Sequence, residues 1–164
     1  MRAVIQRVSR AEVRVKDDVV GRIGVGLLVL LGVSRDDSEE DVRWLATRLG
    51  KVRIFEDDEG RMSRSLNDIG GEVLIISQFT LFGSMKKGSR PSFNRAAPPE
   101  TAIPLYESFL QLMKEQTGDR VATGIFGADM KVELVNDGPV TLVLDSQDRD
   151  FLGFLHRGFP AGKG

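Results

Sequence analysis

Four residues at the end of an apolar run, Ser77-Gln78-Phe79-Thr80, form the first segment of the chain that could carry out chemistry. The apolar pattern at 73–79 predicts a buried strand, and ligands of α/β sheets bind at strand ends. Backbone N–H groups at such an end can stabilise an oxyanion, and Thr80 adds a hydroxyl group. A strand that simply continues into a loop has the same pattern, so the residues alone leave both interpretations open.

The loop expected at 80–97 is the second such segment, because it is long and rich in basic and small residues. Lys86, Lys87 and Arg90 suit contacts with phosphate groups, and Phe93 can stack on a base or pack in the core. A solvated basic loop without any function would have the same composition.

The sequence Asn-Asp-Gly-Pro at 136–139 is the third segment, and it predicts a hairpin turn between strands at 130–135 and 140–144. A hairpin turn needs no function. A cis peptide bond, however, costs only about 0.5–1 kcal/mol before proline, against about 2.5–4 kcal/mol elsewhere. A cis bond between Gly138 and Pro139 would hold two carbonyl groups rigidly enough to select a polar group.

The residues of conventional hydrolases are missing from the sequence. The chain has no Cys, which excludes a thiolate nucleophile, a disulfide scaffold and a Cys-bound metal centre. Its one His, His156, lies near the C-terminus, no Gly-x-Ser-x-Gly motif is present, and no pair of carboxylates stands out on a common face. An enzyme with this sequence would therefore depend on backbone donors, hydroxyl groups, a cation or its own substrate.

The composition is that of one globular domain. The chain has 164 residues, of which 41% are hydrophobic and 29% charged, enough for a substantial core. With 23 Lys and Arg against 24 Asp and Glu, the net charge is −1, so nucleic-acid binding would need a local basic patch. The longest apolar run, 24–33, is too short to span a bilayer, and the N-terminus lacks a signal-peptide pattern. We therefore expect a cytoplasmic protein.

Hydrophobic periodicity predicts strands and two helices that together form a mixed α/β domain. The first helix is expected to begin at Ser38, which can cap it, and to end at Gly50. The second is expected at 98–118, with a kink or a later start because Pro104 removes a helical donor. Its apolar face, which includes Tyr106, is expected in the core. Strands are expected at 11–16, 19–23, 26–32, 53–55, 73–79, 130–135 and 140–144.

The three segments and several others, taken in chain order, resemble the D-aminoacyl-tRNA deacylase family. Any one of the matching stretches is weak evidence, but the ordered set is highly specific and covers residues 1–145. The stretches are Ile5-Gln6-Arg7-Val8, the residues 26–33, Arg53-Ile54-Phe55, Ser77-Gln78-Phe79-Thr80-Leu81, Gly88 with Arg90-Pro91-Ser92-Phe93, the residues 126–130, and the residues 136–141.

The resemblance implies both a fold and an activity. The fold would be α/β, with a single domain at 1–145 of mixed, largely antiparallel β-sheets in a barrel-like arrangement and two main helices. An extension at 146–164 would pack on the domain or on the dimer. Family members are homodimers that hydrolyse the ester of D-aminoacyl-tRNA and of mischarged glycyl-tRNA, without a metal or another cofactor. The partner of this chain would be the acceptor end of tRNA.

The resemblance also implies roles for the first segment. An aminoacyl ester is already activated, so a site needs only to place the carbonyl group, stabilise the oxyanion and admit water. The backbone N–H groups around Phe79 and Thr80 would face the carbonyl group, while Ser77 and Gln78 would shape the end of the strand. No base is evident beside Thr80 to make it a nucleophile, so we favour water assisted by the 2′-hydroxyl group of the tRNA.

Selection between enantiomers would depend on a separate device. In the family, the Gly-Pro pair that corresponds to Gly138 and Pro139 is cis and enters the active site of the other subunit. Its carbonyl groups engage the α-amino group and leave no room for an L side chain, whereas glycine is admitted. Arg7 matches a position that helps to hold this motif.

The resemblance places further residues along the substrate. A wall of the pocket for the adenosine and the aminoacyl group would consist of Phe126, Ala128 and Met130. The loop near the incoming tRNA would contribute Lys86, Lys87, Arg90 and Phe93.

Two other functions remain as alternatives. A non-catalytic nucleic-acid-binding protein on the same fold would use the loop at 86–93 and would need neither 77–81 nor the Gly-Pro pair. An editing module directed at L-amino acids, such as the related domain of some threonyl-tRNA synthetases, would be favoured by a trans Gly138-Pro139 bond.

Overall fold

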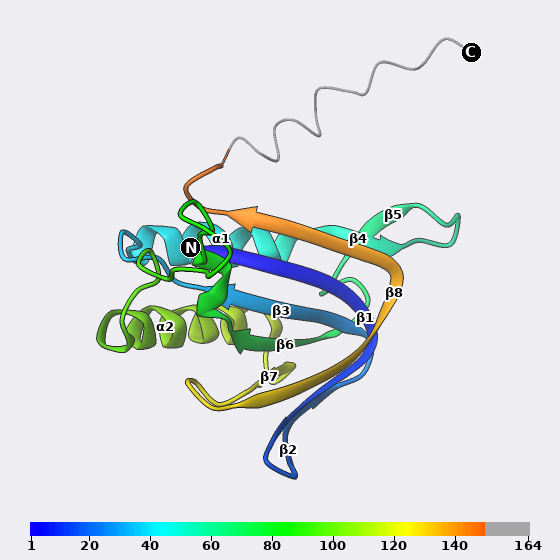
Figure 1. Ribbon diagram of the computed structural model, residues 1–164. Helices are drawn as coiled ribbons and strands as arrows, with labels where there is room; N and C mark the ends of the chain where they lie inside the picture. The colour runs from blue at the N-terminus through cyan, green and yellow to red at the C-terminus, as the bar shows by residue number, and fades with distance from the viewer. Residues whose placement is uncertain (150–164) are drawn as a thin grey trace, which may run out of the picture.

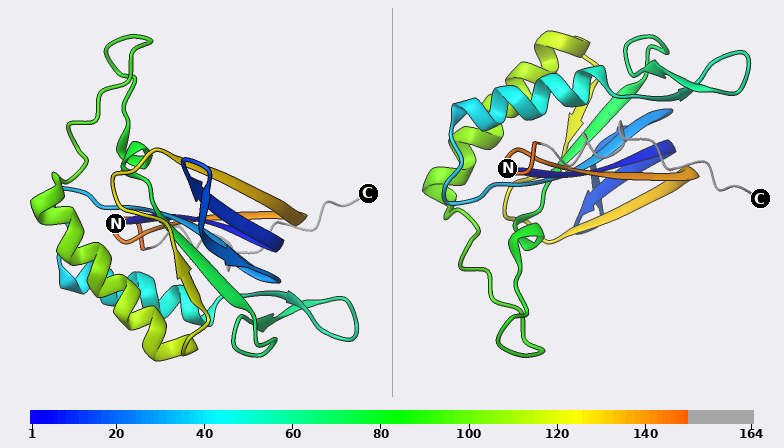
Figure 2. Two further views of the ribbon diagram at one scale, coloured as in Figure 1. Left: turned by 90° about the horizontal axis from the view of Figure 1, so that it is seen from below. Right: turned by 90° about the horizontal axis from the view of Figure 1, so that it is seen from above.

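The computed structural model describes residues 1–149, which form one curled sheet with two helices on one of its faces (Figures 1 and 2). The strands of the sheet are β1 (Arg2–Val15), β2 (Asp18–Ile23), β3 (Gly26–Gly32), β6 (Glu72–Ser77), β7 (Val121–Thr123) and β8 (Met130–Asp145). The hairpin of β4 (Arg53–Glu56) and β5 (Met62–Ser65) is separate. The helices are α1 (Glu39–Lys51), α2 (Pro99–Thr117) and a short 3₁₀ helix, η1 (Phe79–Phe82).

The sheet is mixed but largely antiparallel. Its order is β2-β1-β3-β6-β7, with β8 on the free side of β1. β1 pairs antiparallel with β2, β3 and β8, whereas the β3–β6 and β6–β7 pairs are parallel. β1 and β8 bend together, so the sheet curls toward a barrel (Figure 1). The predicted architecture, a single domain with a barrel-like sheet and two main helices, is confirmed.

The central strands are apolar on both faces because each face covers a core of its own. Leu27 and Leu31 of β3 belong to the core that the sheet forms with α1 and α2. Leu28, their neighbour on the opposite face, packs with Leu74 of β6 and Val13 of β1 inside the curl of the sheet. The alternation follows the two-residue period of a strand, and it confirms that 26–32 is covered on both faces.

The first helix extends past its predicted end, whereas the second has almost its predicted bounds. Ser38 caps α1 as expected, but Gly50 lies inside this helix, where a Cβ atom would collide with the side chain of Gln116. α2 begins at Pro99 and contains Pro104, so the alternative of a later start is wrong. In the part of the chain that the structure describes, no helix is long and apolar enough to cross a membrane.

The hairpin turn predicted in the last strand region is wrong, because β8 is one long strand that pairs with β1 on both sides of the Gly-Pro pair. The two strands are paired up to Gln6 and again from Val8 of β1. Between these positions β8 has four residues, 137–140, while β1 has only Arg7. We call residues 137–140 the β8 bulge. Turn-forming residues predict a hairpin and a bulge equally well, which explains the error.

The C-terminal extension predicted at 146–164 lies mostly outside the described residues, as does His156. Its first residues contact the domain. Ser146 bonds to the backbone of Met1, and Arg149 forms an ion pair with Glu40 at the beginning of α1. How the extension from residue 150 onward packs stays a prediction.

Candidate active site

The carboxyl end of β6 turns sharply, instead of continuing as a strand to Phe79 as predicted. β6 ends at Ser77, and the residues Phe79–Phe82 form η1. The backbone N–H of Gln78 donates to the carbonyl oxygen of Leu31 at 2.7 Å, which ties the beginning of the turn to β3. Two backbone N–H groups further along donate back to the carbonyl oxygens of Gln78 and Thr80. The polar strand end is therefore a compact, internally bonded turn.

This turn has two backbone donors that are not used within it. Among residues 1–149, none accepts a hydrogen bond from the backbone N–H of Phe79 or Thr80. Both residues are exposed, and the Phe79 side chain is 56% exposed. The side-chain amide of Gln78 donates to the hydroxyl oxygen of Thr80. A pair of fixed backbone N–H groups beside an open site is suited to hold a carbonyl oxygen that becomes negative.

A cavity of about 270 Å³ opens beside the turn, between the end of β6, α2 and the segment 124–132. Its polar lining residues include Ser77, Gln78 and Asp129, and the rest of its lining, to which Phe79 belongs, is mainly apolar. The sequence-predicted wall residues Phe126, Ala128 and Met130 all line it. The structure thus brings together six of the predicted site residues.

The wall of the cavity includes a tyrosine that sequence reasoning placed only in the core. The ring of Tyr106, from α2, lies with its centroid 5.6 Å from that of Phe126. Its hydroxyl group donates to the carbonyl oxygen of Ile75 at 3.3 Å, and burial raises the pKa of Tyr106 to about 12. A buried tyrosine needs a hydrogen-bond partner for its hydroxyl group, so its side chain has an apolar and a polar end. This property is the signal in the sequence that indicates a position in the cavity wall.

The predicted basic residues lie away from the cavity. Lys86, Lys87 and Arg90 are exposed in a loop that projects from the body of the molecule, and they form no ion pair with any described residue (Figure 2). Phe93 connects this loop to the turn, because its ring packs edge-on against Phe79 with 5.2 Å between centroids. The aromatic pair thus links the basic loop to the turn that borders the cavity.

The β8 bulge also lies away from the cavity within one chain, since neither Gly138 nor Pro139 lines it. The peptide bond between these two residues is cis. Arg7, which is buried, donates from Nε to the carbonyl oxygen of Asp137 at 2.8 Å and from Nη1 to that of Ile54 at 2.7 Å. A single guanidinium group thus ties β1, β4 and the β8 bulge together.

The site offers hydrogen-bond donors and an apolar hollow. Over residues 1–149, no group of three or more His, Cys, Asp or Glu side chains is arranged to hold a metal ion. The groups that could act on a ligand are the free N–H groups of the turn, the hydroxyl groups of Ser77 and Thr80, and the amide of Gln78. They suit a substrate with a polar carbonyl group next to an apolar portion.

The fold and the site define a class of protein: a single α/β domain whose pocket lies where a strand of the parallel part of the sheet ends. The family model described as D-Tyr-tRNA(Tyr) deacylase matches residues 4–145 of the chain. The chain belongs to this family, so the predicted family membership and the prediction of an enzyme are confirmed.

This chain matches its relatives over most of their lengths. The D-aminoacyl-tRNA deacylase of Anaeromyxobacter dehalogenans is 59% identical over 147 residues, which cover 90% of this chain and 98% of the relative. That of Thermotoga petrophila is 56% identical over 146 residues, covering 89% and 97% of the two chains.

Solved structures have the same fold. A protein described as a c-Myc DNA unwinding element binding protein is 40% identical, with a TM-score of 0.84 over 88% of this chain and 98% of the other. A probable eukaryotic D-amino acid tRNA deacylase is 22% identical, with a TM-score of 0.75 over 87% and 97% of the two chains, and this likeness concerns the fold alone.

Proposed function

We propose that the protein is a cytoplasmic D-aminoacyl-tRNA deacylase, which hydrolyses the ester between a D-amino acid and the terminal ribose of tRNA. The observation that carries this proposal is the pair of unused backbone N–H groups of Phe79 and Thr80 at the edge of the apolar cavity. Relatives that are 59% identical and are described as D-aminoacyl-tRNA deacylases support it.

The reaction needs little from side chains, because the ester is an activated acyl group. The carbonyl oxygen accepts hydrogen bonds from the two N–H groups, which stabilise the negative charge as water attacks the carbonyl carbon. The bond between this carbon and the ribose oxygen then breaks, and the ribose oxygen takes up a proton. The products are free tRNA and the D-amino acid.

Thr80 fits the role of a backbone donor better than that of a nucleophile. Its hydroxyl oxygen already accepts a hydrogen bond from the amide of Gln78, and an amide N–H cannot remove the hydroxyl proton. The ribose 2′-hydroxyl group beside the ester is therefore the group that assists the attacking water in this proposal.

Selection of the D-enantiomer is assigned to the β8 bulge of a partner subunit in a homodimer. Gly138 and Pro139 are exposed and lie away from the cavity of their own chain, while Arg7 fixes the carbonyl group of Asp137 beside them. A rigid bulge that enters the partner's cavity would exclude an L side chain and admit D-aminoacyl and glycyl esters. The exposed ring of Phe79 suits a surface that a partner covers.

The basic loop would hold the acceptor end of the tRNA. Lys86, Lys87 and Arg90 are exposed and without ion-pair partners among the described residues, as contacts with phosphate groups require. Such contacts do not depend on sequence, and they weaken as the salt concentration rises.

The test is deacylation of D-tyrosyl-tRNA, L-tyrosyl-tRNA and glycyl-tRNA by the protein, with no metal added and with the oligomeric state measured in the same buffer. We expect release from the D- and glycyl esters and none from the L-ester. Release of none of the three by a verified dimer would contradict the proposal. Salt-dependent binding of nucleic acid without hydrolysis would instead indicate a binding protein.

A further inference from the structure

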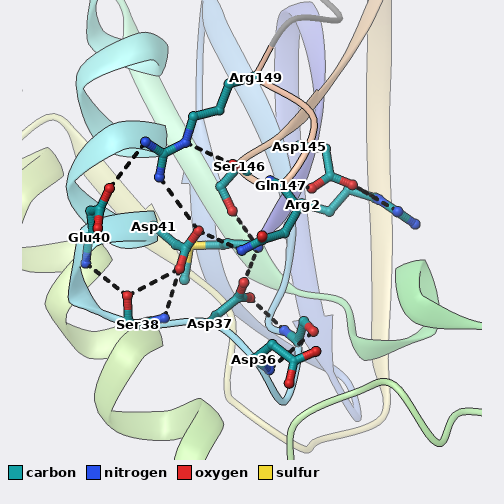
Figure 3. Close-up of polar contacts among 12 residues, drawn as sticks. Arg2, Asp36, Asp37, Ser38, Glu40, Asp41, Asp145, Ser146, Gln147 and Arg149 are labelled. Carbon is teal, nitrogen blue, oxygen red and sulfur yellow. Dashed lines mark hydrogen bonds and ion pairs between the residues drawn. The ribbon is translucent and has the colours of Figure 1, made fainter.

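Arg2 does not line the cavity, yet it bonds to the turn that borders it. Its Nη1 donates to the carbonyl oxygen of Leu81, within η1, at 2.7 Å. On its other side Arg2 forms an ion pair with Asp145 at the end of β8, with 2.8 Å between Nη2 and the carboxylate and a second hydrogen bond from Nε at 2.9 Å (Figure 3). The guanidinium group thus clamps η1 to the last residue of β8.

One backbone carbonyl group of the turn receives its hydrogen bond from this clamp and not from within the turn. The carbonyl oxygens of Gln78 and Thr80 accept hydrogen bonds from within the turn, whereas Leu81 receives its bond from Arg2. Phe82, the last residue of η1, is buried with its ring centroid 4.8 Å from the guanidinium carbon of Arg2. Arg2 therefore contacts both the backbone and the anchoring side chain of the turn.

Arg2 is itself held from both sides. The ammonium group of Met1 is buried, where it forms an ion pair with Asp37 and donates to the hydroxyl oxygen of Ser146 at 2.7 Å. Asp145, the partner of the Arg2 guanidinium, immediately precedes Ser146, so one short segment fixes both residues. The side chains of Arg2 and Asp145 are only 28% and 16% exposed, so water screens their attraction less than at an open surface.

We propose that Arg2 is a positioning residue for ester hydrolysis: it fixes η1 so that the N–H groups of Phe79 and Thr80 point at the ester carbonyl group. This inference rests on the proposed deacylase function. Arg2 acts through the backbone and touches no substrate. A misplacement of about 1 Å at a reacting site can lower the rate about 100-fold, so a loosened turn is expected to be costly.

The experiment compares Arg2→Met with Arg10→Met, since Arg10 also lies on β1 and pairs with a carboxylate, that of Glu133 at 2.8 Å, but is 58% exposed. For D-tyrosyl-tRNA we expect Arg2→Met to lower kcat at least about tenfold with KM changed less than about threefold, because ground-state binding does not use the clamp. Arg10→Met is expected to match the wild type. Arg2→Lys retains a cation that can reach one acceptor, and it should restore part of kcat.

A second readout does not depend on activity. Amide hydrogen exchange of Leu81 and Gly83 reports on the hydrogen bonds within the turn, and we expect it to accelerate about tenfold in Arg2→Met while the amides of 28–30 in β3 keep their rates. Asp145→Asn, which weakens the clamp without removing it, should give a smaller effect of the same kind. This variant and Arg2→Lys keep the test decisive if Arg2→Met unfolds at the assay temperature.

The outcomes separate the two proposals. If turn exchange and kcat in the Arg2 variants equal those of Arg10→Met, the positioning role is wrong. It is equally wrong if the turn loosens but kcat does not fall, or if kcat falls only in proportion to the unfolded fraction. If the wild type hydrolyses none of the esters, the proposed function fails; faster turn exchange in Arg2→Met would then support the clamp alone, and unchanged exchange would overturn it as well.

Discussion

The η1 turn and the β8 bulge are both held by arginines of β1, but in different ways. Arg2 bonds to the turn from a partly buried position and forms an ion pair with the carboxylate of Asp145. Arg7 is buried, and it donates hydrogen bonds to the neutral carbonyl groups of Asp137, in the bulge, and of Ile54. The turn borders the cavity of its own chain, whereas the bulge does not.

Because of this difference, the turn and the bulge are held in place by different parts of the molecule. The buried guanidinium group of Arg7 bonds to backbone carbonyl groups of the bulge and of β4, so a shift of the bulge would break a hydrogen bond to a buried cation and the bulge is coupled to the core. The turn is coupled instead to the N-terminal residue and to the end of β8, through ion pairs that one substitution can break. Changes near the N-terminus should therefore loosen the turn and spare the bulge.

The largest effect on stability is expected from Asp37→Asn. The Asp37 carboxylate and the Met1 ammonium group are both fully buried, and the substitution would leave the ammonium group without its counter-ion. Breaking a buried pair in this way costs about 3–5 kcal/mol of unfolding free energy, which urea denaturation would measure.

Its matched control is Asp36→Asn at the exposed neighbouring position, which should be close to neutral. Hydrogen exchange in the Asp37→Asn protein separates the two regions. The amides of η1 should exchange faster, while that of Val140 in the bulge, which donates to the side chain of Asn136 at 2.8 Å, should keep its wild-type protection. Equal loosening of both regions would contradict the comparison.

The largest effect on selectivity is expected from Gly138→Ala. Gly138 has a φ of +145°, and a Cβ atom there would lie 2.9 Å from the backbone nitrogen of Val140 and 3.2 Å from Nη2 of Arg7. The bulge must shift to relieve these contacts, so we expect kcat/KM for D-tyrosyl-tRNA to fall about 100-fold and discrimination against the L-ester to shrink.

The control for this substitution is Gly60→Ala in the β4–β5 hairpin, where φ is +76° but no atom lies within 4 Å of the added Cβ. It introduces backbone strain without a collision, so it should lower stability and leave hydrolysis unchanged. If Gly138→Ala behaves like Gly60→Ala, the bulge is not part of the site.

The segments of the site follow from the sequence, and the family resemblance also implies Arg7 as a support of the Gly-Pro motif, whereas Arg2 is not among the predicted site residues. Ser77, Phe79 and Phe126 could be found because local residue types mark strand ends and because the ordered motifs resemble a family. The partner of Arg2 at Leu81 lies 79 positions away, and that of Arg7 at Asp137 lies 130 positions away. No local pattern encodes such pairs, since they depend on how the sheet curls.

The strands were predictable to the extent that they were apolar and continuous. The run at 26–32 was correct, because a strand covered on both faces leaves an uninterrupted apolar signal. β5, β7 and residues 2–10 of β1 lie outside the predicted strands; Met62–Ser65 is polar, and Val121–Thr123 is only three residues long. Residues 136–139 predict a hairpin instead of the bulge in β8, because the sequence does not reveal that both halves of that strand pair with β1.

A smaller effect is expected at the cavity wall near the turn, from Tyr106→Phe. The substitution removes one hydrogen bond, to the carbonyl oxygen of Ile75, and should cost about 1 kcal/mol of stability. Tyr106 is the one tyrosine of the chain, so ultraviolet titration reports on it alone. Its pKa should be about 12 in the folded protein and about 10 in denaturant, so the stability that the buried neutral phenol contributes is lost as the pH rises from 10 through 12. A native midpoint near 10 would mean that the wall is open to water.

The smallest effect is expected in the β4–β5 hairpin, which carries the Ile54 carbonyl group that Arg7 uses. Hydrogen bonds from the hydroxyl group of Ser63 and the backbone N–H of Arg61 lower the pKa of Asp57 to about 2. Because this folded-state pKa lies below the unfolded value of about 4, the carboxylate stabilises the hairpin above pH 4, and the contribution is lost as the pH falls through 2.

Urea denaturation of the wild type and of Asp57→Asn measures this contribution. The wild type should be the more stable of the two at pH 6, and the difference should vanish between pH 4 and pH 2. Asp58→Asn, at a side chain that is 93% exposed, should show no such dependence. If the Val140 amide also exchanges faster in acid, the β8 bulge loosens together with the hairpin, and Arg7 transmits the change. The rigidity of the bulge would then depend on the exposed hairpin more than the burial of Arg7 indicates.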